Sequence, residues 1–215
     1  MSYSYVFFDL DGTLADTDLL VVESYLSIYR TFRPHTKVPF RLLASFSGPS
    51  LYEVMKREFP EQDTTTLIRS FQQYSWPRYD VFAEHYPHVM EMLCACKEKG
   101  IHMAVITSKL KGPTMHTFQI LGLQDYIDYV VALDDVQYPK PHPEGILKAI
   151  DYFHADKKDI LYVGDAKTDM EAARNAQVDG CLVTWNLRGK QDIPSNYVVH
   201  HPNQLLEVIL HGKRT

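Results

Sequence analysis

Cysteines and long apolar runs are scarce in this sequence. Only three cysteines occur among 215 residues, Cys94, Cys96 and Cys181, and an odd, sparse set is typical of reduced thiols and not of a disulfide framework. No apolar run approaches the roughly 20 residues that span a membrane. The first predicted strand begins at Tyr5, which leaves no room for a signal peptide before it. We therefore expect a cytoplasmic protein that has no membrane partner.

Clustered positive charge is also missing. The 22 basic and 27 acidic residues are intermixed and give a net charge of −5, so we expect no nucleic-acid partner. Cys94 and Cys96 are close enough to suggest a metal site. No second pair of Cys or His stands at ligand spacing, so packing is the better interpretation. The chain is long enough for one sizeable core and a smaller satellite.

What the sequence does contain is a distinctive stretch at residues 5–13, YVFFDLDGT. A continuous apolar run that ends in a turn signal predicts a strand buried on both faces. Asp9 then lies at its carboxyl end, which is the edge where open α/β sheets bind ligands. Gly12 lets the chain leave the strand in a conformation closed to other residues. By itself the stretch is also compatible with a plain strand and an Asp-Gly turn.

A block without strand signals follows at residues 17–80. Apolar residues recur every three or four positions in three segments, 22–32, 51–59 and 64–74, which is the period of amphipathic helices. Pro60 ends the second segment. We interpret the block as a helical insertion into a different architecture.

Strands and helices alternate through the rest of the chain. This alternation predicts right-handed βαβ units and a parallel sheet. The predicted strands cover 101–106, 129–133, 160–163 and 180–183. The predicted helices carry Val89 to Cys96 and cover 113–121, 143–153, 168–176 and 202–210.

Polar side chains gather just past the predicted strands. Because the carboxyl ends of parallel strands share one crevice, we expect these side chains to meet there. Carboxylates packed together raise one another's pKa values, and a bound divalent cation removes that repulsion. Oxygen-only ligands favour a hard ion, which makes Mg²⁺ the expected cofactor. The residues are Asp9 and Asp11, Thr107 and Ser108, Asp134 and Asp135, and Asp165 with Asp169 four positions on.

An anionic substrate explains the remaining side chains. Thr107 can donate a hydrogen bond to a phosphate oxygen, and Lys140, held between two prolines, can neutralise another. Thr13 and the backbone N–H groups after Asp9 add further donors. Asp9 is then free to attack phosphorus, and Asp11 can protonate the leaving oxygen and later activate water.

Each of these residues also has a plainer interpretation. Thr107 alone is a strand-end hydroxyl, Lys140 alone is a solvated loop lysine, and Asp169 alone is an acid in the first turn of a helix. For Asp134 and Asp135 we expect that one of the two supports the metal site. The joint pattern favours chemistry because every piece falls at the same edge of the predicted sheet.

Four motifs in this order resemble the haloacid dehalogenase superfamily of phosphohydrolases. They begin at Asp9-Leu-Asp11-Gly-Thr13, at Thr107, at Lys140-Pro-His-Pro and at Gly164-Asp165 through Asp169. The resemblance covers nearly the whole chain. It implies an α/β fold with a Rossmann-like parallel sheet core, formed by residues 1–16 and 81–215, and an inserted α-helical cap at residues 17–80.

The resemblance also implies roles for the motif residues. Asp9 is expected to be the nucleophile and Asp11 the acid/base, with Thr107 and Lys140 as further catalytic residues. It implies that Mg²⁺ is held by Asp9, by the carbonyl of Asp11 and by Asp165, with Asp169 as the second acid of the metal site. Dehalogenase members lack an acid at the position of Asp11, so dehalogenation is disfavoured.

Within the superfamily the chain is similar to the phosphoglycolate phosphatase-like subgroup, which includes small pyrophosphatases. The similarity lies in the cap loop FSGPSL at residues 46–51, and in Thr107-Ser-Lys109. It implies that Gly48, Ser108 and Thr13 contact substrate. His88 departs from the pattern, because many relatives have glycine there. Five basic residues of the cap either bind a charged group of the substrate or form a solvated surface, and the second interpretation is favoured. They are Arg33, Lys37, Arg41, Lys56 and Arg57.

We therefore expect a Mg²⁺-dependent phosphatase that hydrolyses a small phosphate monoester through an aspartyl-phosphate. Its partner would be a small phosphorylated metabolite, and the protein a monomer or homodimer. Inorganic pyrophosphatase and a β-phosphoglucomutase-like phosphomutase are the alternative activities. A phospho-receiver domain is disfavoured because receivers lack a cap and place their aspartate after an internal strand. A catalytically inactive scaffold is hard to reconcile with the pair Asp9 and Asp11.

Overall fold

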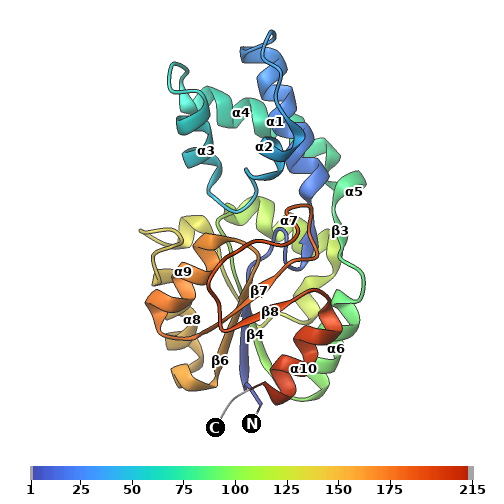
Figure 1. Ribbon diagram of the computed structural model, residues 1–215, viewed down its shortest axis with the longest axis vertical. Helices are drawn as coiled ribbons and strands as arrows, with labels where there is room; N and C mark the ends of the chain where they lie inside the picture. The colour runs from blue at the N-terminus through green and yellow to red at the C-terminus, as the bar shows by residue number, and fades with distance from the viewer. Residues whose placement is uncertain (1, 213–215) are drawn as a thin grey trace.

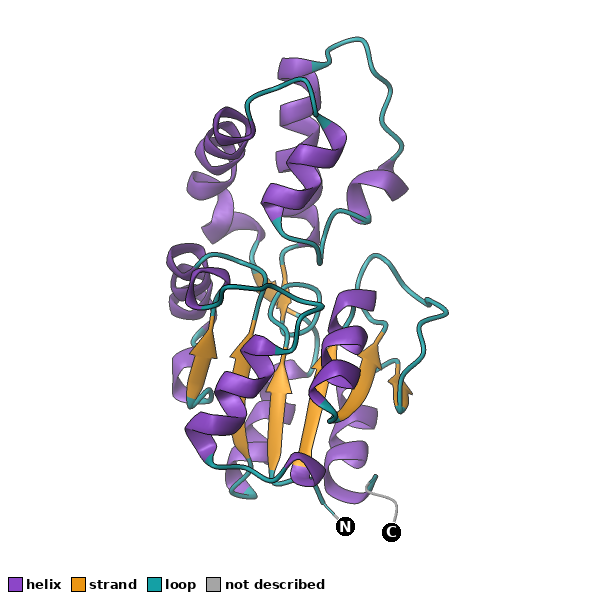
Figure 2. Cartoon of the chain, turned by 90° about the vertical axis from the view of Figure 1, so that its left-hand side faces the viewer, coloured by secondary structure: helices purple, strands orange, loops and turns teal. Residues whose placement is uncertain are grey.

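Strand β1 (Tyr5–Phe8) lies near the middle of a six-stranded sheet in which every pairing is parallel. The computed structural model describes residues 2–212. The order of the strands is β5-β4-β1-β6-β7-β8, and all of them point toward the same end of the molecule (Figure 2). The other strands are β4 (His102–Ile106), β5 (Tyr129–Val131), β6 (Ile160–Gly164), β7 (Asp179–Val183) and β8 (Tyr197–Val199).

Helices cover both faces of the sheet. Helices α8 and α9 lie on one side of it, and α6 and α10 on the other (Figure 1). The α7 side chains Phe118 and Leu121 join the second group. The bounds are α6 (Val89–Glu98), α7 (Lys111–Leu121), α8 (Glu144–Phe153), α9 (Lys167–Ala176) and α10 (Pro202–His211).

Successive side chains of β1 point to opposite faces of the sheet, which explains why this strand is apolar throughout. Val6 and Phe8 belong to the hydrophobic cluster beneath α6 and α10, whereas Phe7 belongs to the cluster beneath α8 and α9. All three are fully buried. Successive side chains of a strand point to opposite faces, so a strand covered on both sides must be apolar at every position.

A group of helices stands beyond the carboxyl ends of the strands (Figures 1 and 2). These helices enclose a hydrophobic cluster of their own, built around Tyr25, Phe46 and Met55. Side chains of Ser50 and Asp63 cap the starts of α3 and α4. The bounds are α1 (Asp18–Phe32), α2 (Phe40–Ala44), α3 (Leu51–Glu58), α4 (Thr64–Ser75), the 3₁₀ turn η1 (Trp76–Arg78) and α5 (Tyr79–Phe82).

Two short strands join this helical cap to the sheet domain. Strand β2 (Ala15–Asp16), on the way into the cap, pairs antiparallel with β3 (Glu84–His85), on the way out. The α/β fold with an inserted helical cap is confirmed. The boundaries at residues 16/17 and 80/81 stay a prediction.

Several elements differ from the sequence expectation. The sequence pattern did not indicate β2, β3, α2 or the edge strand β8, all of which are five residues or shorter. The expected strand 129–133 ends at Val131, because Leu133–Asp135 forms the 3₁₀ turn η3. His88 has a left-handed backbone with φ of 66°, which explains why glycine suits this position.

The two ends of the described chain lie together, at the end of the sheet that is farthest from the cap (Figure 1). The N–H of Tyr3 donates to the carbonyl of Ile209 in α10 at 2.9 Å. No helix within residues 2–212 is both long enough and apolar enough to cross a membrane.

Replacing Phe7 by alanine tests the role of β1 as the strand shared by both cores. The ring has no exposed surface and stacks against Phe153, with 5.8 Å between the ring centroids. We expect the free energy of unfolding to fall by about 3–5 kcal/mol, since the substitution leaves a cavity. Urea unfolding followed by circular dichroism measures it.

The matched control is Phe40→Ala. Phe40 lies in α2 and is 51% exposed, so its loss should change the free energy of unfolding by less than about 0.5 kcal/mol. Equal effects at Phe7 and Phe40 would contradict the assignment.

Candidate active site

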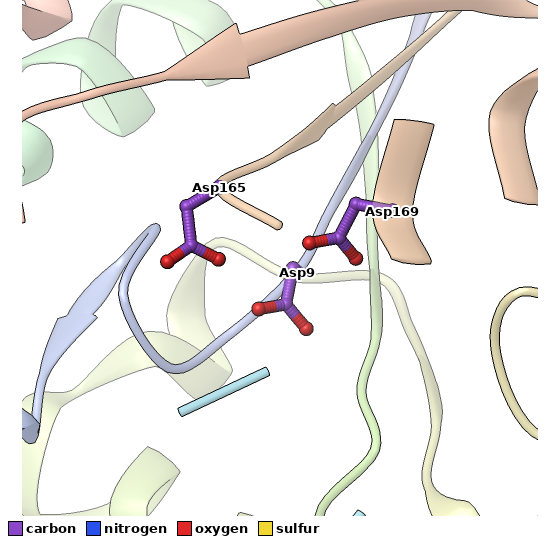
Figure 3. Close-up of side chains that lie close together, drawn as sticks. All are labelled: Asp9, Asp165 and Asp169. Atoms are coloured by element: carbon purple, nitrogen blue, oxygen red, sulfur yellow. The ribbon is translucent and has the colours of Figure 1, made fainter. Parts of the chain in front are cut away.

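Three buried carboxylates converge at the carboxyl edge of the sheet. Asp9 directly follows β1, Asp165 directly follows β6, and Asp169 lies in the first turn of α9. Each of them offers an oxygen, and the three oxygens lie within 4.8 Å of one another. Figure 3 shows the three carboxylates turned toward a common centre. The expected meeting of strand-end acids is therefore present for these three residues.

Lys140 lies between two of these acids. Its Nζ is 2.6 Å from Asp9 Oδ1 and 2.6 Å from Asp169 Oδ1, and the lysine side chain is 5% exposed. Burial lowers the pKa of Lys140, but the two carboxylates outweigh burial and hold that pKa well above its usual value. The lysine is therefore charged, and the interpretation of it as a solvated loop residue is wrong.

The environment of Asp9 leaves negative charge only partly compensated. Burial raises the pKa of Asp9, Lys140 lowers it, and Asp169 raises it again, with a net rise to about 7. A nucleophilic carboxylate needs to be ionised. An additional positive charge beside Asp9 would supply what Lys140 alone does not.

Asp165 provides the second indication of a cation. Its Oδ1 is buried without a hydrogen-bond partner among the described residues, and its Oδ2 contacts Asn186 and Arg188. An orphaned carboxylate oxygen is costly unless something binds it. Asp9, Asp165 and Asp169 thus fit a hard divalent cation, because all their donor atoms are oxygens.

Asp11 has surroundings different from those of Asp9. It is only partly buried, and its Oδ1 accepts hydrogen bonds from Lys109 Nζ at 2.8 Å and from Thr17 Oγ1 at 2.5 Å. Both donors fix the carboxylate at the edge of a cavity that Asp9 also lines. The two aspartates, two positions apart, therefore line one cavity in different surroundings, because Asp9 is buried and Asp11 is partly exposed.

The other expected site residues are placed as follows. Thr107 and Ser108 line the cavity, as does Gly48 from the cap. Thr13 does not line it, but its hydroxyl is buried and has no partner among the described residues. An unsatisfied buried donor of this kind suits a bound anion. Whether these residues contact substrate stays a prediction.

Asp134 and Asp135 do not belong to the acid cluster, and the expectation that one of them supports the metal site is wrong. Asp134 Oδ1 accepts from the backbone N–H of Lys111 at 2.8 Å. Asp135 pairs with the Lys111 side chain at 2.9 Å and accepts from the N–H of Ala132 at 3.0 Å. These hydrogen bonds and the ion pair stabilise the start of α7 and the turn η3.

Sequence reasoning assigned no role to four residues of the site. Thr17 and Lys109 hold Asp11. Asn186 and Arg188 contact Asp165. Arg188 also donates through Nη1 to the carbonyl of Ser47 in the cap. Burial lowers the pKa of Arg188. Asn186 and Arg188 follow β7, so the strand-end rule that found the acids would have found them too had it been applied to that strand.

A cavity of about 240 Å³ lies between the cap and the sheet domain. Asp9, Asp11 and Thr107 line its sheet side, and α1, α3 and α4 contribute its cap side. The enclosed carboxylate of Asp9 is thereby reachable from a space shaped largely by cap side chains. Such a cleft between domains is a common place for a small-molecule site.

Replacing Lys140 by alanine tests the charge balance of the cluster. Asp9 and Asp169 would remain buried and unpaired, so we expect the free energy of unfolding to fall by about 3–5 kcal/mol near pH 7.5 in the presence of a chelator. The loss should be smaller near pH 5. A carboxyl group whose pKa is higher in the folded protein than in the unfolded chain begins to destabilise the fold when the pH rises above its unfolded-state pKa, and this cost is complete only above its folded-state pKa.

Lys148→Ala is the control for this variant. The Lys148 side chain is 44% exposed and 3.6 Å from Glu144, and its loss should cost less than about 1 kcal/mol at either pH. A loss for Lys140→Ala that is equally large near pH 5 would refute the charge balance.

Comparison with known proteins shows which family the chain resembles. A family model described as haloacid dehalogenase-like hydrolase matches residues 6–183. Pyrophosphatase PpaX of Halalkalibacterium halodurans is 31% identical over 212 residues, which are 97% of this chain and 98% of the relative. Pyrophosphatase PpaX of Bacillus thuringiensis strain Al Hakam is 32% identical over 190 residues, covering 88% and 87%.

Solved structures share the fold. A predicted phosphatase from Clostridium acetobutylicum superposes with a TM-score of 0.84 at 24% identity, covering 97% of this chain and 99% of its own. A predicted phosphoglycolate phosphatase from Haemophilus somnus gives 0.82 at 21% identity, covering 97% and 98%. The family model matches most of the chain, and the matched residues include the three acids of the cluster. The protein therefore belongs to the haloacid dehalogenase-like hydrolase family.

Proposed function

We propose that this hydrolase is a Mg²⁺-dependent phosphatase that cleaves a small phosphate monoester through an aspartyl-phosphate on Asp9. The observation that carries the proposal is the pairing of two different aspartates at one cavity. Asp9 is enclosed with Asp165, Asp169 and Lys140 behind it. Asp11 is open to the cavity and held by its own donors.

The chain's residues divide the chemistry in two steps. A carboxylate oxygen of Asp9 bonds to phosphorus while the bond from phosphorus to the alcohol oxygen breaks, and Asp11 gives that oxygen its proton. Asp11 then takes a proton from water, whose oxygen attacks the phosphorus and releases inorganic phosphate from Asp9. Lys140 maintains charge balance beneath the nucleophile, and Thr107 donates to a phosphate oxygen.

Asp9, Asp165 and Asp169 would hold Mg²⁺. When bound, the ion neutralises charge on the phosphate oxygens and stabilises the anionic form of Asp9. The raised pKa of Asp9 and the unpartnered Oδ1 of Asp165 support this assignment.

Inorganic pyrophosphate is the second candidate substrate, favoured by the relatives named pyrophosphatase PpaX at 31% and 32% identity. A phosphomutase is a further alternative, because a structure titled β-phosphoglucomutase from Thermotoga maritima has the same fold with a TM-score of 0.73. That similarity, at 24% identity, concerns the fold alone.

We also propose the kind of substrate and the cellular compartment of the enzyme. A small phosphorylated metabolite suits a cavity of about 240 Å³. All three cysteines are free, with Cys94 exposed, which supports a reducing, cytoplasmic compartment.

Hydrolysis of p-nitrophenyl phosphate tests the proposal. Activity should require Mg²⁺, disappear with a chelator and return on adding Mg²⁺. Asp9→Asn should lower kcat by at least about a thousandfold, because the nucleophile is lost. Asp134→Asn, another strand-end acid that lies outside the cluster, should retain activity within about threefold. Activity that survives Asp9→Asn would refute Asp9 as the nucleophile.

Gly48→Ala tests the approach of the cap loop to the site. Gly48 has φ of +108°, and an added Cβ would lie 2.8 Å from Arg188 Nη1 and 3.0 Å from the Ala166 side chain. We expect kcat/KM to fall by at least about tenfold, equivalent to ~1.4 kcal/mol of transition-state stabilisation.

The control is Gly122→Ala. Gly122 also has a positive φ, +64°, but an added Cβ would have nothing within 4 Å. Its kcat/KM should stay within about twofold of the original value, with only a modest loss of stability. Similar kinetics for both variants would show that crowding at Gly48 is irrelevant to the site.

A further inference from the structure

The cavity above Asp9 and Asp11 has an apolar character on its cap side. Most of the side chains there are aliphatic or aromatic, and they come from the helices α1, α3, α4 and α5, the loop around Gly48 and η1. The larger ones are Leu20, Val21, Tyr25, Phe46, Leu51, Tyr52, Ile68, Phe71, Trp76 and Tyr79. A group that enters the cavity beyond the phosphate therefore meets mostly hydrocarbon and ring surface, with Ser47, Gln72 and Ser75 as the polar exceptions on the cap side.

Positive charge available to a substrate is scarce in this cavity. Among the described residues that line it, Lys109 is the one with a cationic side chain. Its ammonium is already engaged, since Nζ lies 2.8 Å from Asp11 Oδ1 and 4.8 Å from the centroid of the Tyr79 ring. The Lys109 ammonium is therefore already engaged with Asp11 and the Tyr79 ring, which leaves it poorly placed to bind a second anionic group.

Two basic residues of the cap have acidic partners. Arg33 pairs with Glu61 at 2.7 Å, and Arg57 pairs with Glu58 at 2.8 Å. None of the five cap residues considered as charge readers lines the cavity, namely Arg33, Lys37, Arg41, Lys56 and Arg57. Their interpretation as surface residues fits this arrangement.

We propose that the leaving group is an uncharged, apolar alcohol, aromatic or branched, and that the substrate is its phosphate monoester. This inference rests on the proposed phosphatase activity and narrows it. A leaving group with its own negative charge, as in pyrophosphate or phosphoglycolate, would lose hydration in the cavity without gaining a free cationic side chain among the residues that line it. An apolar alcohol loses nothing polar, and it gains roughly fourfold in binding for each methylene buried.

The size of the cavity agrees with such a group. A volume of about 240 Å³ is room for on the order of fifteen water-sized groups at ~15 Å³ each. That is more than a single phosphate needs. Tyr52 and Trp76 line the cavity and are 52% and 48% exposed. The Trp76 ring stacks on His116 and Lys56 Nζ lies 5.8 Å from the centroid of the Tyr52 ring, so the ring surface that remains can contact a planar leaving group.

The experiment compares monoesters of primary alcohols on the intact protein with Mg²⁺. Benzyl phosphate, 2-phosphoglycolate and a series of ethyl, butyl and hexyl phosphates are measured, with inorganic pyrophosphate as a further substrate. The primary alkoxide leaving groups differ little in intrinsic reactivity, so kcat/KM among these esters reports recognition. Pyrophosphate has a better leaving group, so recognition must outweigh reactivity for benzyl phosphate to exceed it. We expect benzyl phosphate to exceed phosphoglycolate and pyrophosphate by at least about tenfold, and kcat/KM to rise along the alkyl series.

The outcomes separate this inference from the proposed function. A preference for phosphoglycolate or pyrophosphate would overturn the apolar leaving group while leaving the phosphatase in place. A flat alkyl series would also overturn it. Failure to hydrolyse any of these compounds, or p-nitrophenyl phosphate, would overturn the phosphatase activity and this inference with it.

Tyr52→Arg provides a second test by placing a cation at the cavity. The ratio of kcat/KM for benzyl phosphate to that for phosphoglycolate should fall by about tenfold or more. The carboxylate of phosphoglycolate gains a cationic partner, and the ring of benzyl phosphate loses the contact with the Tyr52 ring. Tyr152→Arg is the matched control. Tyr152 lies in α8, is 53% exposed and does not line the cavity, so the ratio should not move. An unchanged ratio for Tyr52→Arg would count against the inference.

Discussion

The contact of one buried ammonium with two buried carboxylates underlies the site. Lys140 reaches Asp9 and Asp169 at 2.6 Å each, with almost no exposed surface on any of the three. A parallel sheet brings its strand ends to one edge, and when those ends carry acids the fold must compensate their charge. Lys140 compensates part of it. The raised pKa of Asp9 and the orphaned oxygen of Asp165 indicate a remaining deficit that suits a cation.

Charge and hydrocarbon are segregated between the two parts of the molecule. The sheet domain contributes the acid cluster, Asp11 and Lys109, whereas the cap contributes a largely apolar surface facing them. Arg188 joins the two, since it contacts Asp165 in the sheet domain and the Ser47 carbonyl in the cap. If the proposed activity holds, the acid cluster and the apolar cap surface lie on different elements, so a substitution in the cap would change the apolar surface without moving the acid cluster.

The acid cluster at the edge of the sheet could be predicted from sequence because it depends on local patterns. Apolar runs that end in Asp9 and Asp165 mark strand ends, and the topology of parallel strands brings strand ends together. The same rule failed at Asp134, because β5 ends early and the Asp134 carboxylate accepts a hydrogen bond from the backbone N–H of Lys111 at the start of α7. The character of the cavity was not predictable. It depends on which faces of α1, α3 and α4 turn toward the sheet, and that orientation is decided by packing around residues such as Phe46, not by local periodicity.

The position of the chain ends has a practical consequence. The N–H of Tyr3 bonds to Ile209, and both ends of the described chain lie at the foot of the sheet, far from the cap (Figure 1). A fusion partner or an affinity tag attached to either end is therefore kept away from the cleft. An enzyme tethered to a support through either terminus would present its cavity outward, with the approach of substrate unobstructed.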